Sequence, residues 1–278
     1  MTESTTIPFV VLVTGTRGIG LEIGKECARR GAAVAMVYNK DKAAAESTLQ
    51  AVIEEGKKVN NTNDHKIFQA DLSQAENCKK VFDEVIAAYG RVDALVNNSG
   101  VNPDHDIGDR KQCPDFEFFS STVHKTMTTN FESCANMSFL AIRQMQDQKT
   151  RSSKLPTTQQ HKGALVHITS RAANRGELTC PAYASSKAAM NIFSQSLAQR
   201  FAPQGIVSYG VAPGWVETEM ASAVMNGPDR DAVLAQHPLG RIAQPEEIAN
   251  CVAYCIFDAP AALTGTVLKV NGASHLSA

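Results

Sequence analysis

Two residues with complementary chemistry, Tyr183 and Lys187, stand four positions apart in a stretch whose pattern predicts a helix over residues 182–201. Residues four apart lie on one face of a helix, so the phenol and the ammonium are expected to be neighbours. A nearby ammonium stabilises tyrosinate and lowers the pKa of the phenol from about 10 toward the working pH. Tyr183 is then a usable general acid toward a carbonyl, or a general base toward an alcohol. Tyr38 and Lys42 share the spacing, but Tyr38 ends a predicted strand, so we interpret that pair as a surface coincidence.

The hydroxyl of Ser170 comes 13 residues before Tyr183. The preceding residues, 164–168, predict a strand, which places Ser170 just beyond its carboxyl end. Ligands gather at that edge of a parallel sheet, so this hydroxyl can meet a substrate. A serine that caps a turn or a helix is the alternative interpretation.

Clustered glycines follow the first apolar run, where a predicted strand changes into a predicted helix. Glycines at such a turn let the backbone approach a pyrophosphate, which then lies at the positive N-terminus of the helix. Any tight turn can use glycines, but the position after the first strand favours a dinucleotide site. The residues are Thr14-Gly15-Thr16-Arg17-Gly18-Ile19-Gly20.

Seven short apolar runs alternate with amphipathic stretches, the pattern of a parallel sheet with helices on both faces. The predicted strands are Phe9–Val13, Ala33–Tyr38, Lys66–Phe68, Ala94–Val96, Ala164–Ile168, Ile206–Val211 and Val267–Val270. The predicted helices include Leu21–Arg29, Ala43–Glu54, Ala75–Ala88, Ala182–Phe201 and Pro245–Phe257. We expect one doubly wound α/β domain, residues 1–278, on a seven-stranded parallel sheet.

Two segments interrupt this alternation. Residues 102–122 combine Pro, Asp and Gly with aromatic residues and predict a long loop with some buried anchors. Residues 146–162 are polar and predict a surface insertion. Neither segment is long enough to be a domain.

Composition and charge exclude several classes of protein. The chain has 278 residues, of which 43% are hydrophobic, and its net charge is -1. That balance offers no field for nucleic acid or for an anionic membrane, and the apolar runs are far shorter than a membrane span. No secretory signal opens the chain. We therefore expect a soluble, cytoplasmic protein that binds neither nucleic acid nor membrane.

The seven cysteines are too scattered for a disulfide framework, and none forms a CxxC pair. Cys251 and Cys255 share a helical face, but no neighbouring His or Cys completes a metal site. We interpret them as core or surface thiols and expect no metal.

These separated motifs, taken together, resemble the short-chain dehydrogenase/reductase family over nearly the whole chain. Within the family, Pro213–Met220 and Pro238-Leu239-Gly240-Arg241 are most similar to 3-oxoacyl-[acyl-carrier-protein] reductases and related carbonyl reductases. Besides the residues above, the resemblance rests on Asn97-Asn98-Ser99-Gly100, Asn130, Pro213-Gly214 with Thr218, Leu263-Thr264-Gly265 and Val270-Asn271-Gly272.

The resemblance implies that Asn130, Ser170, Tyr183 and Lys187 reduce a ketone to a secondary alcohol. Ser170 and Tyr183 would bind the ketone oxygen, and Tyr183 would protonate it while hydride arrives from the cofactor. Lys187 would hold the nicotinamide ribose and tune Tyr183. Asn130 would hold a water that relays protons to Lys187, and an asparagine at a helix kink is compatible with the same position.

The resemblance also implies a set of cofactor ligands that spans the carboxyl edge of the sheet. The pyrophosphate would lie over the glycine turn, the adenine near Asp71 and the nicotinamide amide near Thr218. The ligands are Gly15, Thr16, Arg17, Gly18, Ile19, Tyr38, Asn39, Lys40, Asp71, Leu72, Asn97, Ser99, Gly100, Tyr183, Lys187, Pro213, Gly214, Val216 and Thr218.

We expect NADPH rather than NADH as the cofactor. In NAD-dependent relatives an acid after the second strand takes the ribose hydroxyls and repels a 2′-phosphate, but Tyr38 occupies that position here. Lys40 follows, and Arg17 can reach the same phosphate from the glycine turn. Asp41 competes as a ribose ligand, but we interpret it as the N-cap of the next helix. Plain surface charge is the alternative for Arg17 and Lys40.

Three further expectations follow from the resemblance and from departures from it. The glycine turn is one residue shorter than the family pattern, which would weaken cofactor binding. Ser99 replaces the usual alanine, a small change that adds one hydroxyl. Residues 215–241 would form a lid over a small ketone or acyl-thioester substrate, and the protein would be a homo-oligomer, a tetramer or dimer. A nucleotide-binding sensor or scaffold with little turnover, or a carbonyl, steroid or sugar dehydrogenase, stays an alternative.

Overall fold

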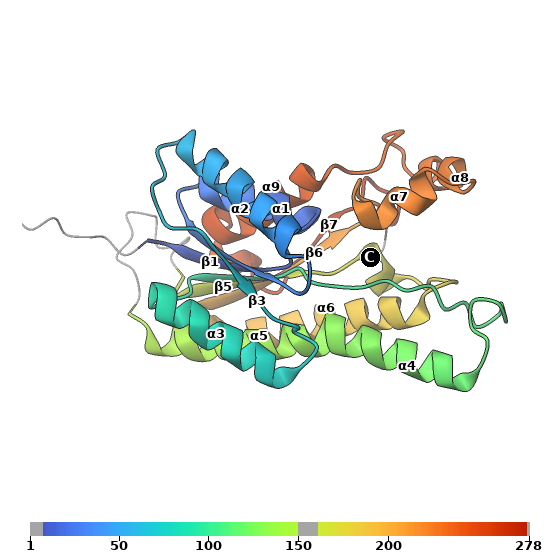
Figure 1. Ribbon diagram of the computed structural model, residues 1–278, viewed down its shortest axis with the longest axis horizontal. Helices are drawn as coiled ribbons and strands as arrows, with labels where there is room; N and C mark the ends of the chain where they lie inside the picture. The colour runs from blue at the N-terminus through green and yellow to red at the C-terminus, as the bar shows by residue number, and fades with distance from the viewer. Residues whose placement is uncertain (1–7, 150–160, 277–278) are drawn as a thin grey trace, which may run out of the picture.

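The computed structural model describes residues 8–149 and 161–276. Its strands form one sheet in which all neighbouring strands pair in parallel (Figure 1). The strands are β1 (Val10–Thr14), β2 (Ala33–Tyr38), β3 (Lys66–Gln69), β4 (Ala94–Asn97), β5 (Gly163–Ile168), β6 (Ile206–Pro213) and β7 (Val267–Val270). Their order in space is β3-β2-β1-β4-β5-β6-β7, that of a doubly wound fold. All seven predicted strands are confirmed, with ends that differ by at most two residues.

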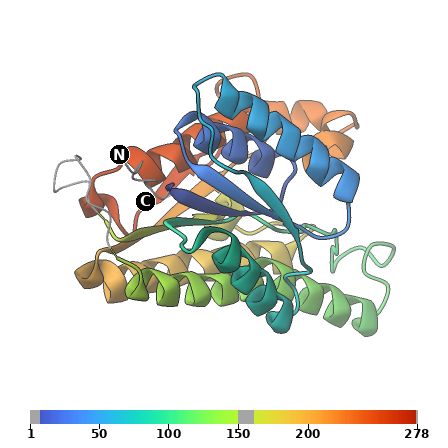
Figure 2. The same cartoon turned by 60° about the vertical axis from the view of Figure 1, so that its left-hand side comes forward.

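Helices cover both faces of the sheet (Figures 1 and 2). One face carries α1 (Ile19–Arg29), α2 (Lys42–Lys57) and α9 (Pro245–Ala253). The other side carries α3 (Ala75–Tyr89), α4 (Phe116–Met127), α5 (Ser133–Asp147) and α6 (Pro181–Phe201). Two short helices, α7 (Glu219–Met225) and α8 (Arg230–Ala235), follow β6 at the end of the molecule that also holds the loop before α4 (Figure 1).

Short segments of other helical type join these elements. The π-helical segments are η1 (Thr128–Glu132), between α4 and α5, and η5 (Tyr254–Asp258), after α9. The 3₁₀ turns are η3 (Arg171–Asn174), η4 (Ala202–Gln204) and η6 (Ala261–Leu263).

The core consists of two layers, one on each face of the sheet. Successive side chains of a strand point to opposite faces, so Val11 packs with Ile23 of α1 and Ile248 of α9. Leu12, one residue on, packs with Met137 of α5 in the second layer. Complete burial of such a side chain stabilises the fold by about 1.5–3 kcal/mol, which explains why the strands are apolar throughout.

Two predicted boundaries are wrong. Residues 102–122 are not all loop, because α4 begins at Phe116, where the Asp115 carboxylate accepts a hydrogen bond from Phe118 N (2.7 Å) and caps the helix. The helix predicted over 245–257 ends as an α-helix at Ala253 and continues as a π-helix. Most of the predicted insertion, residues 150–160, lies outside the described residues.

The strand order reverses between β1 and β4, and ligands bind at the carboxyl edge of such a switch point. The segments that carry the glycine turn, Asn97-Asn98-Ser99-Gly100 and Ser170 all leave the sheet at this edge. Within the described residues, no helix has the length and apolar content to span a bilayer.

Candidate active site

Ser170, Tyr183 and Lys187 meet at the carboxyl end of β5. Ser170 follows β5 directly, and its Oγ accepts a hydrogen bond from Ala172 N (3.1 Å), so it also caps η3. Lys187 Nζ, on α6, donates to the Ile168 carbonyl (2.8 Å) and lies 5.8 Å from the ring centroid of Tyr183. Ser170 is also near enough to Tyr183 to influence the pKa of its phenol. The structure therefore brings the phenol, the ammonium and the serine hydroxyl together.

Burial dominates the acidity of Tyr183 and Lys187. It raises the pKa of Tyr183 to about 12, against the opposing effect of Ser170. It lowers the pKa of Lys187 to about 8, because the ammonium loses its hydration. The net shift is opposite to the predicted lowering of the phenol pKa, because desolvation is the largest influence on Tyr183. Tyr183 is therefore protonated at neutral pH, the form that a general acid needs.

Asn130 lies at the break between α4 and α5, within π-helical η1, and is completely buried. Its Oδ1 accepts from Val101 N (2.8 Å), and its Nδ2 donates to the Val101 carbonyl (3.0 Å) and to Ser186 Oγ (3.0 Å). A Cβ at Gly100 would lie 3.3 Å from Asn130 Oδ1 and 3.4 Å from Lys187 Nζ. Asn130 is thus an asparagine at a helix irregularity that also holds the segment after β4 beside Lys187.

His105 supports the catalytic helix, and the sequence analysis missed it. Its ring is completely buried, and Nε2 accepts from Ala182 N (3.0 Å) at the N-terminus of α6. Nδ1 lies 2.8 Å from the Pro103 carbonyl, so the proton is on Nδ1 and Nε2 is the acceptor. The N-cap residue of α6, Cys180, makes no side-chain cap of its own. Because His105 and Ala182 are 77 positions apart, no local pattern signals this contact.

The glycine turn has the shape of a cradle for a ligand. Gly15 and Gly18 have positive φ angles, +89° and +52°, which disfavour other residues. A Cβ at Gly15 would lie 2.8 Å from Asn98 Nδ2, and one at Gly18 would lie 3.0 Å from Thr218 Cγ2. Gly18 is the N-cap of α1, and no side chain in the described part of the chain caps that helix. The uncapped N–H groups and the bare backbone fit a pyrophosphate, the central group of a dinucleotide.

The shortened turn still leads directly into α1. Helix α1 begins at Ile19, and Gly20 N donates to the Arg17 carbonyl (3.0 Å). From α2, Thr48 Oγ1 donates to the Thr16 carbonyl (2.8 Å). The turn is therefore braced by a neighbouring helix despite the missing residue.

The two asparagines after β4 point in different directions. Asn98 faces the glycine turn, since its Nδ2 donates to the Thr14 carbonyl (2.9 Å). The N–H groups of Asn98 and Ser99 donate to Thr14 Oγ1 (2.9 and 3.0 Å). Asn97 is buried, and its Nδ2 donates to Ser138 Oγ (3.0 Å). The side chain of Asn97 therefore faces the interior, and Asn98, which the sequence analysis left out of the ligands, contacts the turn.

The residues at the end of β2 are uncharged at Tyr38 and Asn39 and cationic at Lys40. Tyr38 is largely buried, whereas Asn39 and Lys40 are exposed. Asp41 Oδ1 accepts from Ala44 N (2.9 Å) and caps α2, so its interpretation as an N-cap is confirmed.

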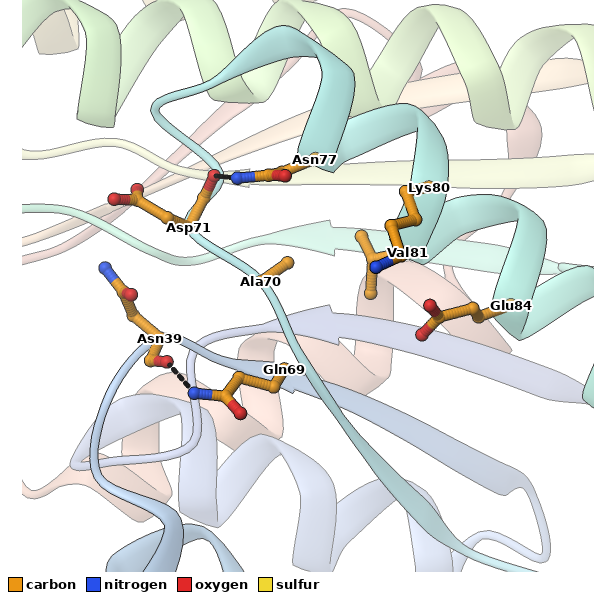
Figure 3. Close-up of a pocket in the computed structure, with 8 residues that line it drawn as sticks. All are labelled: Asn39, Gln69, Ala70, Asp71, Asn77, Lys80, Val81 and Glu84. Carbon is orange, nitrogen blue, oxygen red and sulfur yellow. Dashed lines mark hydrogen bonds between the residues drawn. The ribbon is translucent and has the colours of Figure 1, made fainter.

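A hollow of about 270 Å³ lies between the end of β3 and α3 (Figure 3). Hydrogen bonds from Ser73 lower the pKa of the Asp71 carboxyl, and the nearby Lys40 lowers it further. Leu72, the next residue, is buried in the second core layer. The hollow holds two residues that the sequence analysis assigned to the cofactor, Asn39 and Asp71, and none of the four assigned to catalysis. Its lining residues are Asn39, Gln69, Ala70, Asp71, Asn77, Lys80, Val81 and Glu84.

Arg17 makes a contact that the sequence analysis did not predict. Its Nη1 pairs with Glu219 Oε2 of α7 at 3.0 Å, and the two side chains are 64% and 77% exposed. The cation assigned to a 2′-phosphate is thus paired with an acid of the segment assigned to the lid.

The segment after β6 connects the glycine turn with α7 and α8. Val216 and Ala243 form an isolated parallel bridge, which fixes the two ends of the lid segment. Thr218 is the N-cap of α7 and faces Gly18, as the contact above shows. Met220 and Leu239 are exposed in the segment assigned to the lid. The residues of this segment and of the end of β6 that were assigned to the cofactor are Pro213, Gly214, Val216 and Thr218.

All seven cysteines are free thiols. Cys255 is buried and Cys251 is half-buried, and burial raises the pKa of both thiols. Both pack in the core layer of α1 and α9. Among the described residues, no three His, Cys, Asp or Glu side chains gather in a group that could hold a metal.

A doubly wound sheet that carries a dinucleotide cradle and a Ser–Tyr–Lys cluster at one edge defines a nicotinamide-dependent oxidoreductase. The family model described as enoyl-(acyl carrier protein) reductase matches residues 13–275. The chain belongs to the short-chain dehydrogenase/reductase family, and it is an NAD(P)-dependent oxidoreductase.

Individual relatives cover nearly the whole chain. The 3-oxoacyl-[acyl-carrier-protein] reductase FabG of Escherichia coli K12 is 32% identical over 273 residues, 96% of this chain and 97% of its own. The acetoacetyl-CoA reductase of Allochromatium vinosum is 30% identical over 265 residues, 95% and 97% of the two chains. A short-chain dehydrogenase from Burkholderia cenocepacia J2315, solved in complex with NADP, has a TM-score of 0.79 and 27% identity, and the match covers 95% and 96% of the two chains.

Proposed function

We propose that this protein uses NADPH to reduce a ketone, such as a 3-oxoacyl thioester, to a secondary alcohol. The observation that carries the proposal is the meeting of Ser170, Tyr183 and Lys187 at the sheet edge that also holds the glycine cradle. The similarity to a 3-oxoacyl-[acyl-carrier-protein] reductase and to an acetoacetyl-CoA reductase supports the thioester class.

The side chains have separate tasks in this reaction. A reduced nicotinamide, when bound at this edge, supplies hydride to the carbonyl carbon. Ser170 and Tyr183 hold the carbonyl oxygen by hydrogen bonds, and Tyr183 gives its proton to that oxygen. Lys187 then stabilises the phenolate by its charge, and Asn130 would hold a water that relays a proton to Lys187. The ketone thereby gains one hydride on its carbonyl carbon and one proton on its oxygen, and the product is a secondary alcohol.

The cofactor ligands divide along the sheet edge. The residues Gly15–Ile19 would hold the pyrophosphate, Asp71 and Leu72 the adenine, and Lys187 the nicotinamide ribose. The backbone of Asn97, Ser99 and Gly100 would lie along the ribose, and Pro213, Gly214, Val216 and Thr218 along the nicotinamide.

The preference for NADPH is supported by the charges around the end of β2. Tyr38 brings no negative charge to the ribose position, and Lys40 is exposed there. Asp41 is committed to the cap of α2 and is therefore a poor ribose ligand. Arg17 can take a phosphate only by leaving Glu219, an exchange of one exposed anion for another.

We also propose a homo-oligomer, a dimer or tetramer, that buries helix faces. Phe139 of α5 and Ile192 of α6 are 58% and 65% exposed, although both are large and apolar. Size-exclusion chromatography with light scattering tests the oligomer.

The cytoplasm is the proposed location of the protein. All seven cysteines are free thiols, which supports a reducing compartment.

Steady-state oxidation of NADPH, followed at 340 nm with a panel of ketones, tests the proposed reaction. The panel contains acetoacetyl thioesters, simple ketones, steroids and sugars, and each is repeated with NADH. We expect turnover of at least one ketone and a higher kcat/KM with NADPH. Turnover of steroids or sugars alone would replace the thioester class. Tight nucleotide binding without any turnover would identify a sensor or scaffold instead.

A further inference from the structure

Arg171 is a buried cation next to Ser170 in the chain, and the reaction described above does not use it. It is 7% exposed and directly follows Ser170, as the first residue of η3. One of its nitrogens, Nη2, donates to Gln236 Oε1 (3.1 Å) just after α8. The side chain of Arg171 therefore connects the segment that follows Ser170 with the segment assigned to the lid.

The other terminal nitrogen of Arg171 has no partner. Nη1 is buried and makes no hydrogen bond within the described residues. Glu177, the carboxylate whose charge acts on Arg171, is engaged with Arg175 Nε at 3.3 Å. No ion pair of Arg171 occurs among the described residues. A buried guanidinium in this state is costly, because a buried charge normally has a counter-ion.

The pKa of Arg171 also reflects its burial and the charges of its neighbours. Burial lowers the pKa of Arg171, and the neighbouring charge of Arg175 lowers it further, whereas Glu177 opposes both effects. The cation is therefore poorly compensated by this chain. A water could satisfy the N–H group, but it would leave the charge unpaired.

We propose that Arg171 binds an anionic group of the substrate, so that the preferred ketones are oxo acids, with a carboxylate a few bonds from the carbonyl. A guanidinium presents parallel N–H donors that match a carboxylate. The unpartnered Nη1 supplies one such donor, on the residue that directly follows the serine assigned to the ketone oxygen. Gln236 then connects the bound anion with the lid. This inference rests on the proposed ketone reduction and names oxo acids, in place of thioesters, as the preferred ketones.

Matched pairs of substrates test the charge alone. Pyruvate, acetoacetate and levulinate place the carboxylate at three distances from the carbonyl, and their methyl esters are the neutral partners. We expect one acid to exceed its ester in kcat/KM. Arg171→Met should lower that acid-to-ester ratio roughly tenfold to hundredfold, the range of a hydrogen bond to a charged group. Arg171→Lys, which keeps the charge, should retain part of the preference.

Two controls separate charge recognition from a structural role. Arg175→Met removes the neighbouring cation that is already paired with Glu177, and we expect the ratio to change by less than about threefold. Thermal unfolding should show Arg171→Met as stable as the wild type or more stable, because an unpaired buried charge is replaced by an apolar side chain. An acid-to-ester ratio that Arg171→Met leaves unchanged in all three pairs would overturn the inference.

A binding measurement keeps this inference separate from the proposed reaction. The Tyr183→Phe protein, saturated with NADP⁺, is titrated with the same three acids by calorimetry, with and without Arg171→Met. Binding that depends on Arg171, without turnover by the wild type, would support the anion site and count against ketone reduction. Turnover with a ratio independent of Arg171 would leave ketone reduction standing and overturn the anion site. Absence of both would overturn both.

Discussion

The catalytic end and the adenosine end of the site are held in different ways. At the catalytic end, Lys187 and Asn130 are buried and make hydrogen bonds to backbone atoms of neighbouring segments. At the end where Arg17 was assigned to the adenosine 2′-phosphate, Arg17 and Glu219 are exposed and contact each other through their long side chains. Buried groups have one low-energy partner, whereas exposed charges exchange partners at little cost. Substitutions at the catalytic end should therefore have large effects and those at the adenosine end small ones.

The largest effect should come from the residue that moves the proton. Tyr183→Phe removes the acid and should lower kcat by about 10²–10⁴-fold, the contribution of general acid catalysis. The affinity for NADPH, measured by fluorescence titration, should change little, because the glycine cradle is untouched. A Phe variant that keeps more than a third of the wild-type kcat would remove Tyr183 from its assigned role.

Lys187 should show a dependence on pH as well as a loss of rate. Burial lowers its pKa to about 8, so the ammonium is lost as pH rises through that value, while Tyr183, with a pKa of about 12, stays protonated. We expect kcat to decline above pH 8. Lys187→Met should lower kcat at least tenfold, weaken NADPH binding and abolish this decline. A decline that persists in Lys187→Met would assign the titration to another group.

A related contrast separates what the sequence could predict from what it could not: local patterns are visible in the sequence, whereas contacts between distant residues are not. The strands and the Ser170, Tyr183 and Lys187 cluster follow from apolar runs and helical spacing, which the fold preserves. The pKa of Tyr183 did not follow, because spacing says nothing about burial. The contacts of His105 with Ala182 and of Arg17 with Glu219 join residues far apart in the chain. Such contacts depend on where loops fold back, and no local periodicity encodes them.

His105 should have an intermediate effect, because it acts through the catalytic helix. His105→Phe keeps a ring but leaves Ala182 N without its acceptor. Loss of this cap should lower the free energy of unfolding by about 1–2 kcal/mol and reduce kcat several-fold. His105→Gln, which restores an acceptor, should recover part of both. Denaturant unfolding and kcat are measured on the same samples.

An exposed histidine provides the control for His105. His124 lies on α4 with its side chain in solvent, and His124→Gln should leave both the unfolding free energy and kcat unchanged. Equal stability and kcat for His105→Phe and the wild type would show that α6 needs no cap from this loop.

The smallest effects should come from the pair formed by Arg17 and Glu219. Arg17→Ala should lower the NADPH preference while it changes kcat/KM for NADH little, because only the 2′-phosphate needs the cation. Glu219→Gln frees Arg17 and removes a negative charge from the phosphate site. An exposed ion pair contributes about 0–1 kcal/mol, so NADPH should bind up to about fivefold more tightly. Glu217→Gln, two residues earlier, removes an exposed acid that contacts Gln244 and should leave the preference unchanged.

Arg17→Ala and Glu219→Gln are expected to change the affinity for NADPH in opposite directions. This difference distinguishes a phosphate ligand from plain surface charge. If Arg17 only anchors α7, both variants break the same ion pair and should change NADPH binding in the same direction. If Arg17 binds the phosphate, the variants should move NADPH affinity in opposite directions, and the double variant should resemble Arg17→Ala. Equal kcat/KM for NADPH and NADH in the wild type would contradict the preference itself and assign the ribose to an acid such as Asp41.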